Sequence, residues 1–327
     1  MAPEPERRVA VIDLGSNSFR MVVFDGVHGT WEPVDERSTA VRIGEGLVAT
    51  GLLGEDAMRR ALRTLGGFTE LCERYRLDEH SIDAVATSAI RDAENGGVFL
   101  EQVRRRTGLA VRVLSREQEA RYGYLAAVNS TTLTDGCVLD LGGGSLQLVH
   151  VARRLARESG SWRLGAVRMT ERFLAGDGPA KRSQLKALQA HVARKLERAP
   201  WLPDSGARLV GLGGTVRNLA AAIGARAADV PADGVQGVLI ERDALADLVV
   251  RLAALPVTER GTVPGIKAGR ADIVLAGALV IEGVMRAGAF TTLEVTRAGL
   301  REGIMFERQL AHQQLGAVLS SSDIRAA

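Results

Sequence analysis

Two short glycine-rich segments are the parts of this 327-residue chain best suited to chemistry. Glycine adopts positive φ angles at little cost, so consecutive backbone N–H groups can turn into one concavity and bind an anion. Serine hydroxyls add further hydrogen-bond donors. Both segments follow an Asp-Leu pair. They predict two phosphate-binding loops, formed by Gly15, Ser16, Asn17 and Ser18 and by Gly142, Gly143, Gly144 and Ser145.

Polar side chains follow each loop at a spacing that points them to one side. Alternate residues of a strand share a face, so Ser18 and Arg20 project together, as do Ser145 and Gln147. The intervening residues are apolar and belong to the core. If two domains face each other, both polar pairs line a shared cleft.

Two carboxylates precede the loops. Asp13 and Asp140 each end the predicted strand that leads into a glycine segment. Mg²⁺ is usually bound by one or two protein carboxylates and keeps several waters. Asp13 and Asp140 are therefore the candidate metal ligands.

A third glycine turn supports the same chemistry. Gly213, Gly214 and Thr215 lie between a predicted strand at 208–210 and a helix that begins at Val216. No GxxxxGK[ST] motif is present, and Val216 stands where a dinucleotide fingerprint needs its last glycine. The chain has no G-x-S-x-G motif, and its five histidines show no metal-binding spacing.

Short apolar strands and amphipathic helices must position these loops. Ser115 and Gln118 form a capping-box pattern, which predicts that a helix begins there. The hydrophobic periodicity predicts strands at 9–12, 19–24, 82–87 and 111–114, and helices at 55–76, 93–107, 185–196 and 273–290.

An internal repeat indicates how the chain is divided. Residues 11–21 match residues 138–148 position by position: an apolar strand, Asp-Leu-Gly, two small residues, Ser and an alternating strand. A repeat at this separation is typical of duplicated domains. We predict an N-terminal domain at 1–126, a C-terminal domain at 127–312 and a tail at 313–327.

Composition excludes several classes of protein. Hydrophobic residues make up 46% and charged residues 25%, as in an ordinary globular protein. The net charge of +3 does not indicate a nucleic-acid binder. The two cysteines, Cys72 and Cys137, lie far apart and form no CxxC motif, which fits a reducing compartment. No secretory signal or membrane span is expected, so we predict a cytoplasmic protein.

Five motifs in order resemble the exopolyphosphatase/guanosine pentaphosphate phosphohydrolase (Ppx/GppA) family. They span about residues 9–308 and stand at 12–20, 86–95, 119–121, 140–145 and 300–303. The resemblance implies an α/β fold with two ribonuclease-H-like domains of the actin/hexokinase ATPase superfamily and a cleft between them. It also implies Mg²⁺-dependent hydrolysis of terminal phosphate from polyphosphate, or of the 5′-phosphate of pppGpp. The chain is similar to the short, two-domain members, and the family often forms homodimers.

The resemblance assigns roles to particular residues. Glu119 matches the catalytic glutamate of the family, and a carboxylate beside a phosphate can orient or deprotonate an attacking water. Arg20 and Arg91 match positions expected to bind phosphate. Arg270 matches a basic position near the polyphosphate path.

Three positions depart from the family pattern. Gln147 replaces a glutamate that is implied to help hold metal or water, and an amide there cannot act as a base. Gln118 replaces a second glutamate, and Arg116 replaces a glycine. An exopolyphosphatase remains the first hypothesis and a pppGpp phosphohydrolase the second. A weakly catalytic protein that binds polyphosphate or guanosine phosphates is the third, and a kinase or ATPase of the superfamily is the fourth.

Overall fold

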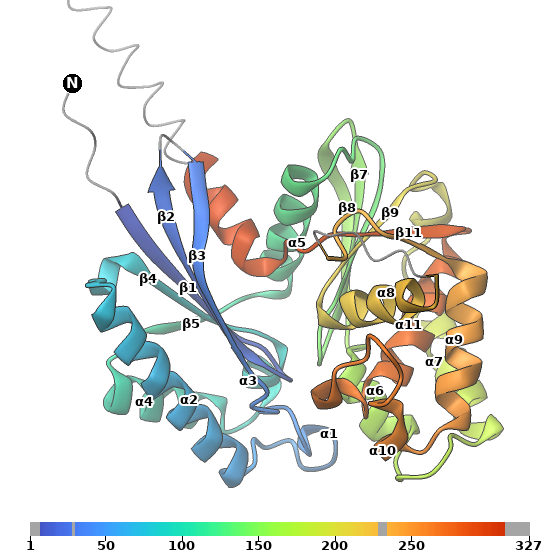
Figure 1. Ribbon diagram of the computed structural model, residues 1–327, viewed down its shortest axis with the longest axis horizontal. Helices are drawn as coiled ribbons and strands as arrows, with labels where there is room; N and C mark the ends of the chain where they lie inside the picture. Colours follow the sequence, from blue (N-terminus) through green and yellow to red (C-terminus); the bar gives the residue numbers. More distant parts are fainter. Residues whose placement is uncertain (1–6, 28–29, 228–233, 311–327) are drawn as a thin grey trace, which may run out of the picture.

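The chain builds two α/β domains around two mixed sheets, and the computed structural model describes residues 7–27, 30–227 and 234–310. We call the parts built on the first and second sheet the first and second domain (Figure 1). The predicted tail, 313–327, lies outside the described residues, as do residues 311–312 of the predicted second domain.

The first sheet has five strands in the order β3-β2-β1-β4-β5. The first three strands are antiparallel, whereas β4 and β5 run parallel to β1. This order and these directions are those of a ribonuclease-H-like fold. The strand bounds are β1 Arg7–Leu14, β2 Phe19–Val27, β3 Thr30–Thr39, β4 Ile82–Ala86 and β5 Val111–Val113.

Helices cover one face of this sheet with an apolar core. The long helix α2 carries a stripe of buried residues that includes Leu65 and Phe68, and α4 adds Phe99 and Val103. Figure 1 shows α2 and α4 together on the outer side of the sheet. The helix bounds are α1 Leu47–Thr50, α2 Glu55–Arg74, α3 Ser88–Asp92 and α4 Gly96–Thr107.

The second sheet repeats this plan. Its six strands have the order β10-β11-β9-β6-β7-β8, with β6, β7 and β8 antiparallel and β9 parallel to β6. The strand bounds are β6 Gly136–Leu141, β7 Leu146–Ala152, β8 Leu155–Trp162, β9 Leu209–Leu212, β10 Leu239–Glu241 and β11 Thr292–Val295.

Helix α11 lies at the centre of the second domain. Its residues are buried on nearly every side, and it contacts α6, α7, α8 and α9. The helix bounds are α6 Ala166–Phe173, α7 Arg182–Leu196, α8 Gly214–Ala227, α9 Arg242–Ala254, α10 Val257–Arg260 and α11 Val274–Ala287. None of the helices in residues 7–27, 30–227 and 234–310 combines the length and the apolar character needed to cross a bilayer.

Two helices lie between the sheets. Helix α5 (Arg116–Ser130) packs Tyr122 and Leu125 with the first sheet and Ala126 and Ala127 with the second. A helix at 300–310 follows β11 of the second sheet but packs on the first sheet, beside α5 (Figure 1). The predicted boundary between residues 126 and 127 falls within α5 and stays a prediction.

The two matching sequence segments form two matching hairpins. In the first, Asp13 pairs with Arg20 across β1 and β2; in the second, Asp140 pairs with Gln147 across β6 and β7. Each hairpin therefore has a four-residue loop that begins two residues after the aspartate. The repeat places equivalent residues at equivalent positions in both sheets.

The strands that follow these hairpins were not predicted from the sequence. β3 contains Pro33 and β8 contains Gly160, and most of their side chains are exposed. Both are edge strands, so neither needs the alternation of apolar residues that a buried face imposes. The predicted helix at 93–107 begins only at Gly96, because a separate short helix, α3, ends at Asp92.

Candidate active site

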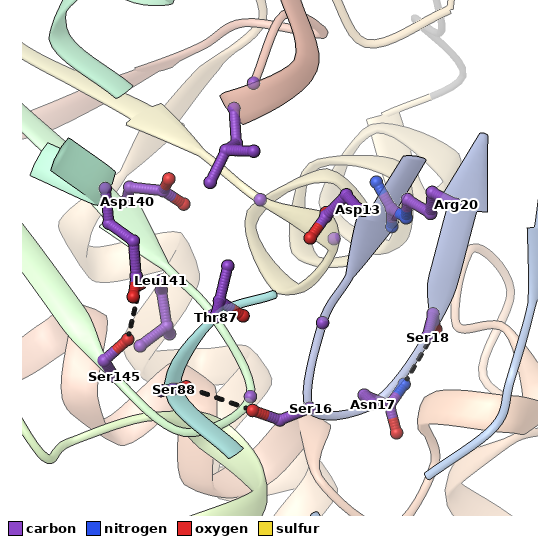
Figure 2. A pocket seen from close by; sticks show the side chains of 18 of the residues that line it. Asp13, Ser16, Asn17, Ser18, Arg20, Thr87, Ser88, Asp140, Leu141 and Ser145 are labelled. Atoms are coloured by element: carbon purple, nitrogen blue, oxygen red, sulfur yellow. Dashed lines mark hydrogen bonds between the residues drawn. The ribbon is translucent and has the colours of Figure 1, made fainter. Parts of the chain in front are cut away.

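A cavity of about 120 Å³ lies where the two hairpin loops meet. Both loops contribute to its wall, together with the turn at Gly213 and Gly214 and the start of the helix at 300–310. All the predicted site residues line it except Arg91, Gly144 and Thr215. Figure 2 shows Asp13 and Arg20 on one side of this pocket and Asp140 and Ser145 on the other.

The three exceptions lie close by but face elsewhere. Thr215 is buried in α8 against Gly277 of α11, so its side chain supports the turn from behind. Gly144 lies against Ser88 and leaves no room for a side chain. Arg91 pairs with Glu119 and donates to the carbonyl oxygen of Leu114 at 2.8 Å. The binding of phosphate by Arg91 stays a prediction.

Glu119 is buried on the first turn of α5. The predicted capping box is present, because Gln118 donates its backbone N–H to the Ser115 hydroxyl at 3.1 Å and its side-chain oxygen accepts from the Ser115 N–H at 2.9 Å. The box fixes the start of the helix and hence the position of Glu119. Burial raises the pKa of Glu119 to about 7, although the guanidinium of Arg91 acts in the opposite direction.

Arg91 contacts one carboxylate oxygen of Glu119, Oε1, and side chains of the second hairpin contact the other. Glu119 Oε2 accepts from the Gln147 amide at 3.0 Å and from the Ser145 hydroxyl at 3.3 Å. The Gln147 amide also donates to Ser145 at 2.9 Å. Gln147, which was predicted at the metal site, therefore contacts the candidate catalytic carboxylate directly. Its role toward a metal stays a prediction.

Asp13 and Asp140 are two half-buried carboxylates that line the cavity between the domains. Burial raises the pKa of both groups, and the charge of Asp13 helps to raise that of Asp140 to about 6. Asp13 Oδ1 is buried and has no hydrogen-bond partner among the described residues. A buried, unpartnered carboxylate oxygen beside a second carboxylate is a suitable donor set for Mg²⁺.

No larger cluster of acidic, histidine or cysteine side chains that could hold a metal occurs in the part of the chain that the structure describes. A cation here would have two carboxylate ligands from the protein, and waters or substrate oxygens would complete its shell. The donor set thus suits Mg²⁺ bound together with a phosphate better than a cation held by protein ligands alone.

Four arginines line the same cavity. Arg20 and Arg270 were predicted, and burial lowers the pKa of each to about 10, so both stay charged at neutral pH. Arg217 and Arg301 were missed. Arg301 is 4% exposed and pairs with Glu36 at 3.1 Å, from the edge strand β3. Only its place in the 300–303 motif could have identified it from the sequence.

The sequence pattern that could have identified Arg217 as a residue of the cavity is weaker. Arg217 lies two residues beyond the third glycine turn, on α8, and donates to the carbonyl oxygen of Arg297 at 2.8 Å. A position on the first turn of a helix after a glycine loop favours anion binding, because the backbone N–H groups there are unpaired. The four guanidiniums bring a strong positive charge to the cavity that the carboxylates of Asp13, Asp140 and Glu119 also line.

The chain resembles known proteins over most of its length. It is 33% identical over 307 residues to an uncharacterized protein of Streptomyces coelicolor, covering 91% of this chain and 89% of that one. It is 29% identical over 328 residues to exopolyphosphatase 1 of Mycobacterium tuberculosis, covering 97% of this chain and 92% of that enzyme.

Solved structures agree with this likeness. A Ppx/GppA family member from Aquifex aeolicus matches with a TM-score of 0.76 and 30% identity, over 94% of this chain and 99% of that one. An exopolyphosphatase from Cytophaga hutchinsonii matches in fold with a TM-score of 0.86 and 23% identity, over 93% of this chain and 98% of that one. The profile of the Ppx/GppA phosphatase family matches residues 22–312, and the chain belongs to this family.

Proposed function

We propose that the protein is an exopolyphosphatase that releases terminal orthophosphate from inorganic polyphosphate by attack of water. The observation that supports this most is the meeting of two phosphate loops, four arginines and one buried glutamate around a single cavity. Polyphosphate carries a negative charge on every unit, and a group of guanidiniums around one cavity suits that repeated charge.

Different residues of the site have different roles in hydrolysis. The loop N–H groups and the four arginines bind the phosphoryl oxygens and stabilise the charge on them. Glu119 orients a water in line with the terminal phosphorus and accepts its proton. The water oxygen bonds to phosphorus as the bond to the bridging oxygen breaks, so the products are orthophosphate and a chain one unit shorter. A Mg²⁺ held by Asp13 and Asp140 would neutralise charge on the reacting phosphate.

We rank polyphosphate above pppGpp as the substrate because of the residues that line the cavity. No aromatic side chain lines it among the described residues, so it offers no ring on which a guanine could stack. A nucleotide site normally combines phosphate binding with an apolar or aromatic surface for the base. We therefore place hydrolysis of pppGpp second.

The test is phosphate release from tripolyphosphate, long-chain polyphosphate and pppGpp, each with Mg²⁺ and with EDTA. We expect release from polyphosphate that EDTA abolishes, and slower release from pppGpp. Faster release from pppGpp than from either polyphosphate would make the second hypothesis the correct one. The homodimer and the cytoplasmic location stay predictions; light scattering at several protein concentrations checks the former.

A Gln147→Glu variant distinguishes the hypothesis of an enzyme from that of a protein that only binds polyphosphate. The new carboxylate would face Glu119 across the 3.0 Å contact that the amide now makes. If the protein is an enzyme, we expect no large gain in phosphate release, because the new carboxylate restores the residue of the family pattern but also places a like charge beside Glu119, which disfavours its ionised form.

The control for this change is wild-type protein assayed beside Gln147→Glu over a range of Mg²⁺ concentrations. A gain of about 10²–10³ in turnover, the size of one preorganised electrostatic contact, would contradict the prediction. It would mean that the wild-type protein holds phosphate chains and that Gln147 keeps it from cutting them.

A further inference from the structure

The tips of the two phosphate loops touch. A Cβ atom on Gly143 would lie 2.9 Å from the Cβ of Ser16, and one on Gly144 would lie 2.5 Å from the Ser88 hydroxyl. Ser16 and Ser88 are themselves hydrogen-bonded at 3.1 Å, as Figure 2 shows. The second loop therefore rests on the first domain without intervening side chains, and a small shift of either domain would change the shape of the cavity.

Arg168 of α6 bridges this contact from behind. Its Nε donates to the carbonyl oxygen of Gly144 at 3.1 Å, and its Nη2 donates to Asp92 Oδ2 at 2.9 Å. The side chain is only 14% exposed. Asp92 ends α3, directly after Arg91, which pairs with Glu119. One planar guanidinium thus connects the second phosphate loop to the helix that carries the partner of Glu119.

Helix α6 also contacts the first domain one turn further along. Glu171 accepts from the backbone N–H of Gly46 at 2.7 Å and from that of Val48 at 3.4 Å. The space behind the loops, between the contacts of Arg168 and Glu171, is a void of only about 10 Å³. This is about the smallest volume that can hold one water. This packing leaves α6 little freedom to move relative to α3 and the loops.

We propose that Arg168 is a positioning residue that fixes the second phosphate loop against α3, and so sets the spacing of the two loops around the substrate. The inference rests on the proposed function for its kinetic consequence. Arg168 does not line the cavity, so it acts through Gly144 and Asp92. Small displacements of groups that hold a substrate lower turnover strongly, by about 10²-fold for roughly 1 Å.

Arg163 supplies a matched control. It also binds Asp92 Oδ2, at 3.0 Å, but it is 59% exposed, and the carbonyl oxygen of Gly144 is bonded by Arg168 instead. Arg163→Ala therefore removes the same charge from the same aspartate and leaves the loop contact intact. If Arg168 positions the loop, only Arg168→Ala lowers kcat for polyphosphate, by about 100-fold, with little change in KM.

One further variant and one additive sharpen the kinetic test. Arg168→Lys can donate along only one of the two directions that the guanidinium spans, so its kcat should lie between those of wild type and Arg168→Ala. Millimolar guanidinium chloride should restore part of the activity of Arg168→Ala and leave Arg163→Ala unchanged. Equal losses in Arg168→Ala and Arg163→Ala would overturn the proposal, since the loss of one cationic partner of Asp92 would then explain both.

Hydrogen–deuterium exchange tests the positioning without any turnover. Amides of residues 142–147 should exchange faster in Arg168→Ala than in wild type or Arg163→Ala, while those of α2 stay unchanged. Unaltered exchange at 142–147 would refute the proposed role even if activity fell. If wild-type protein releases no phosphate but the exchange result holds, the proposed function fails and the positioning role stands.

Discussion

Replacing Glu119 with glutamine is expected to lower the kcat for polyphosphate by about 10²–10⁴-fold, the usual range for loss of a general base. The substitution keeps the size of the side chain and its place on α5. It removes the charge that accepts a proton and that pairs with Arg91. Phosphate release measured under saturating polyphosphate checks this, and direct binding of polyphosphate should persist because the arginines and loops are untouched.

Glu117→Gln is the control for this change. Glu117 lies on the same turn of α5 but is exposed, so the variant alters net charge and helix start in the same way. Its kcat should match that of wild type. A Glu119→Gln enzyme that kept more than about a tenth of wild-type activity would remove Glu119 from the chemical step.

Replacing Gly303 with alanine is expected to destabilise the fold by about 1–3 kcal/mol, the typical effect of overpacking a tight contact. Gly303 lies on the helix at 300–310 where it crosses α5, and a Cβ there would overlap the carbonyl oxygen of Tyr122. Because that obstacle is backbone, it cannot rotate away. Urea or thermal denaturation of the two proteins measures the loss.

Gly67→Ala gives the opposite result with the same chemical change. Gly67 lies within α2, and a Cβ there would meet nothing within 4 Å. Alanine favours a helix over glycine by about 1 kcal/mol, so this variant should be more stable than wild type. If Gly303→Ala melted like Gly67→Ala, the close crossing of the two helices would not exist in solution.

Much of the site could be predicted because its signals are local. The glycine loops, Asp13, Asp140 and the capping box at Ser115 are each contained in a few consecutive residues, and the internal repeat is enough to relate the two hairpins to each other. The family resemblance singles out Glu119 as the candidate catalytic residue, which composition and periodicity alone would have left as an ordinary acid on the first turn of a helix.

The remaining features depend on contacts between distant parts of the chain. Arg217 and Arg301 reach the cavity only because α8 and the helix at 300–310 converge on it. The edge strands β3 and β8 are polar because one neighbour and solvent satisfy them. Arg168 resembles any surface arginine until Gly144 and Asp92 are seen beside it. No periodicity in the sequence records such pairings.

The return of the helix at 300–310 to the first sheet has a consequence for biosynthesis. Ile304 and Met305 cover apolar residues of β1 and β2, including Val11 and Phe24, that no earlier helix except α5 shields. Chains are made from the N-terminus at about 5–20 residues per second. This face of β1 and β2 therefore stays uncovered for some tens of seconds, until residues 300–310 have been made. Until the ribosome has delivered that helix, the first domain exposes an unfinished core and is a natural client for a chaperone.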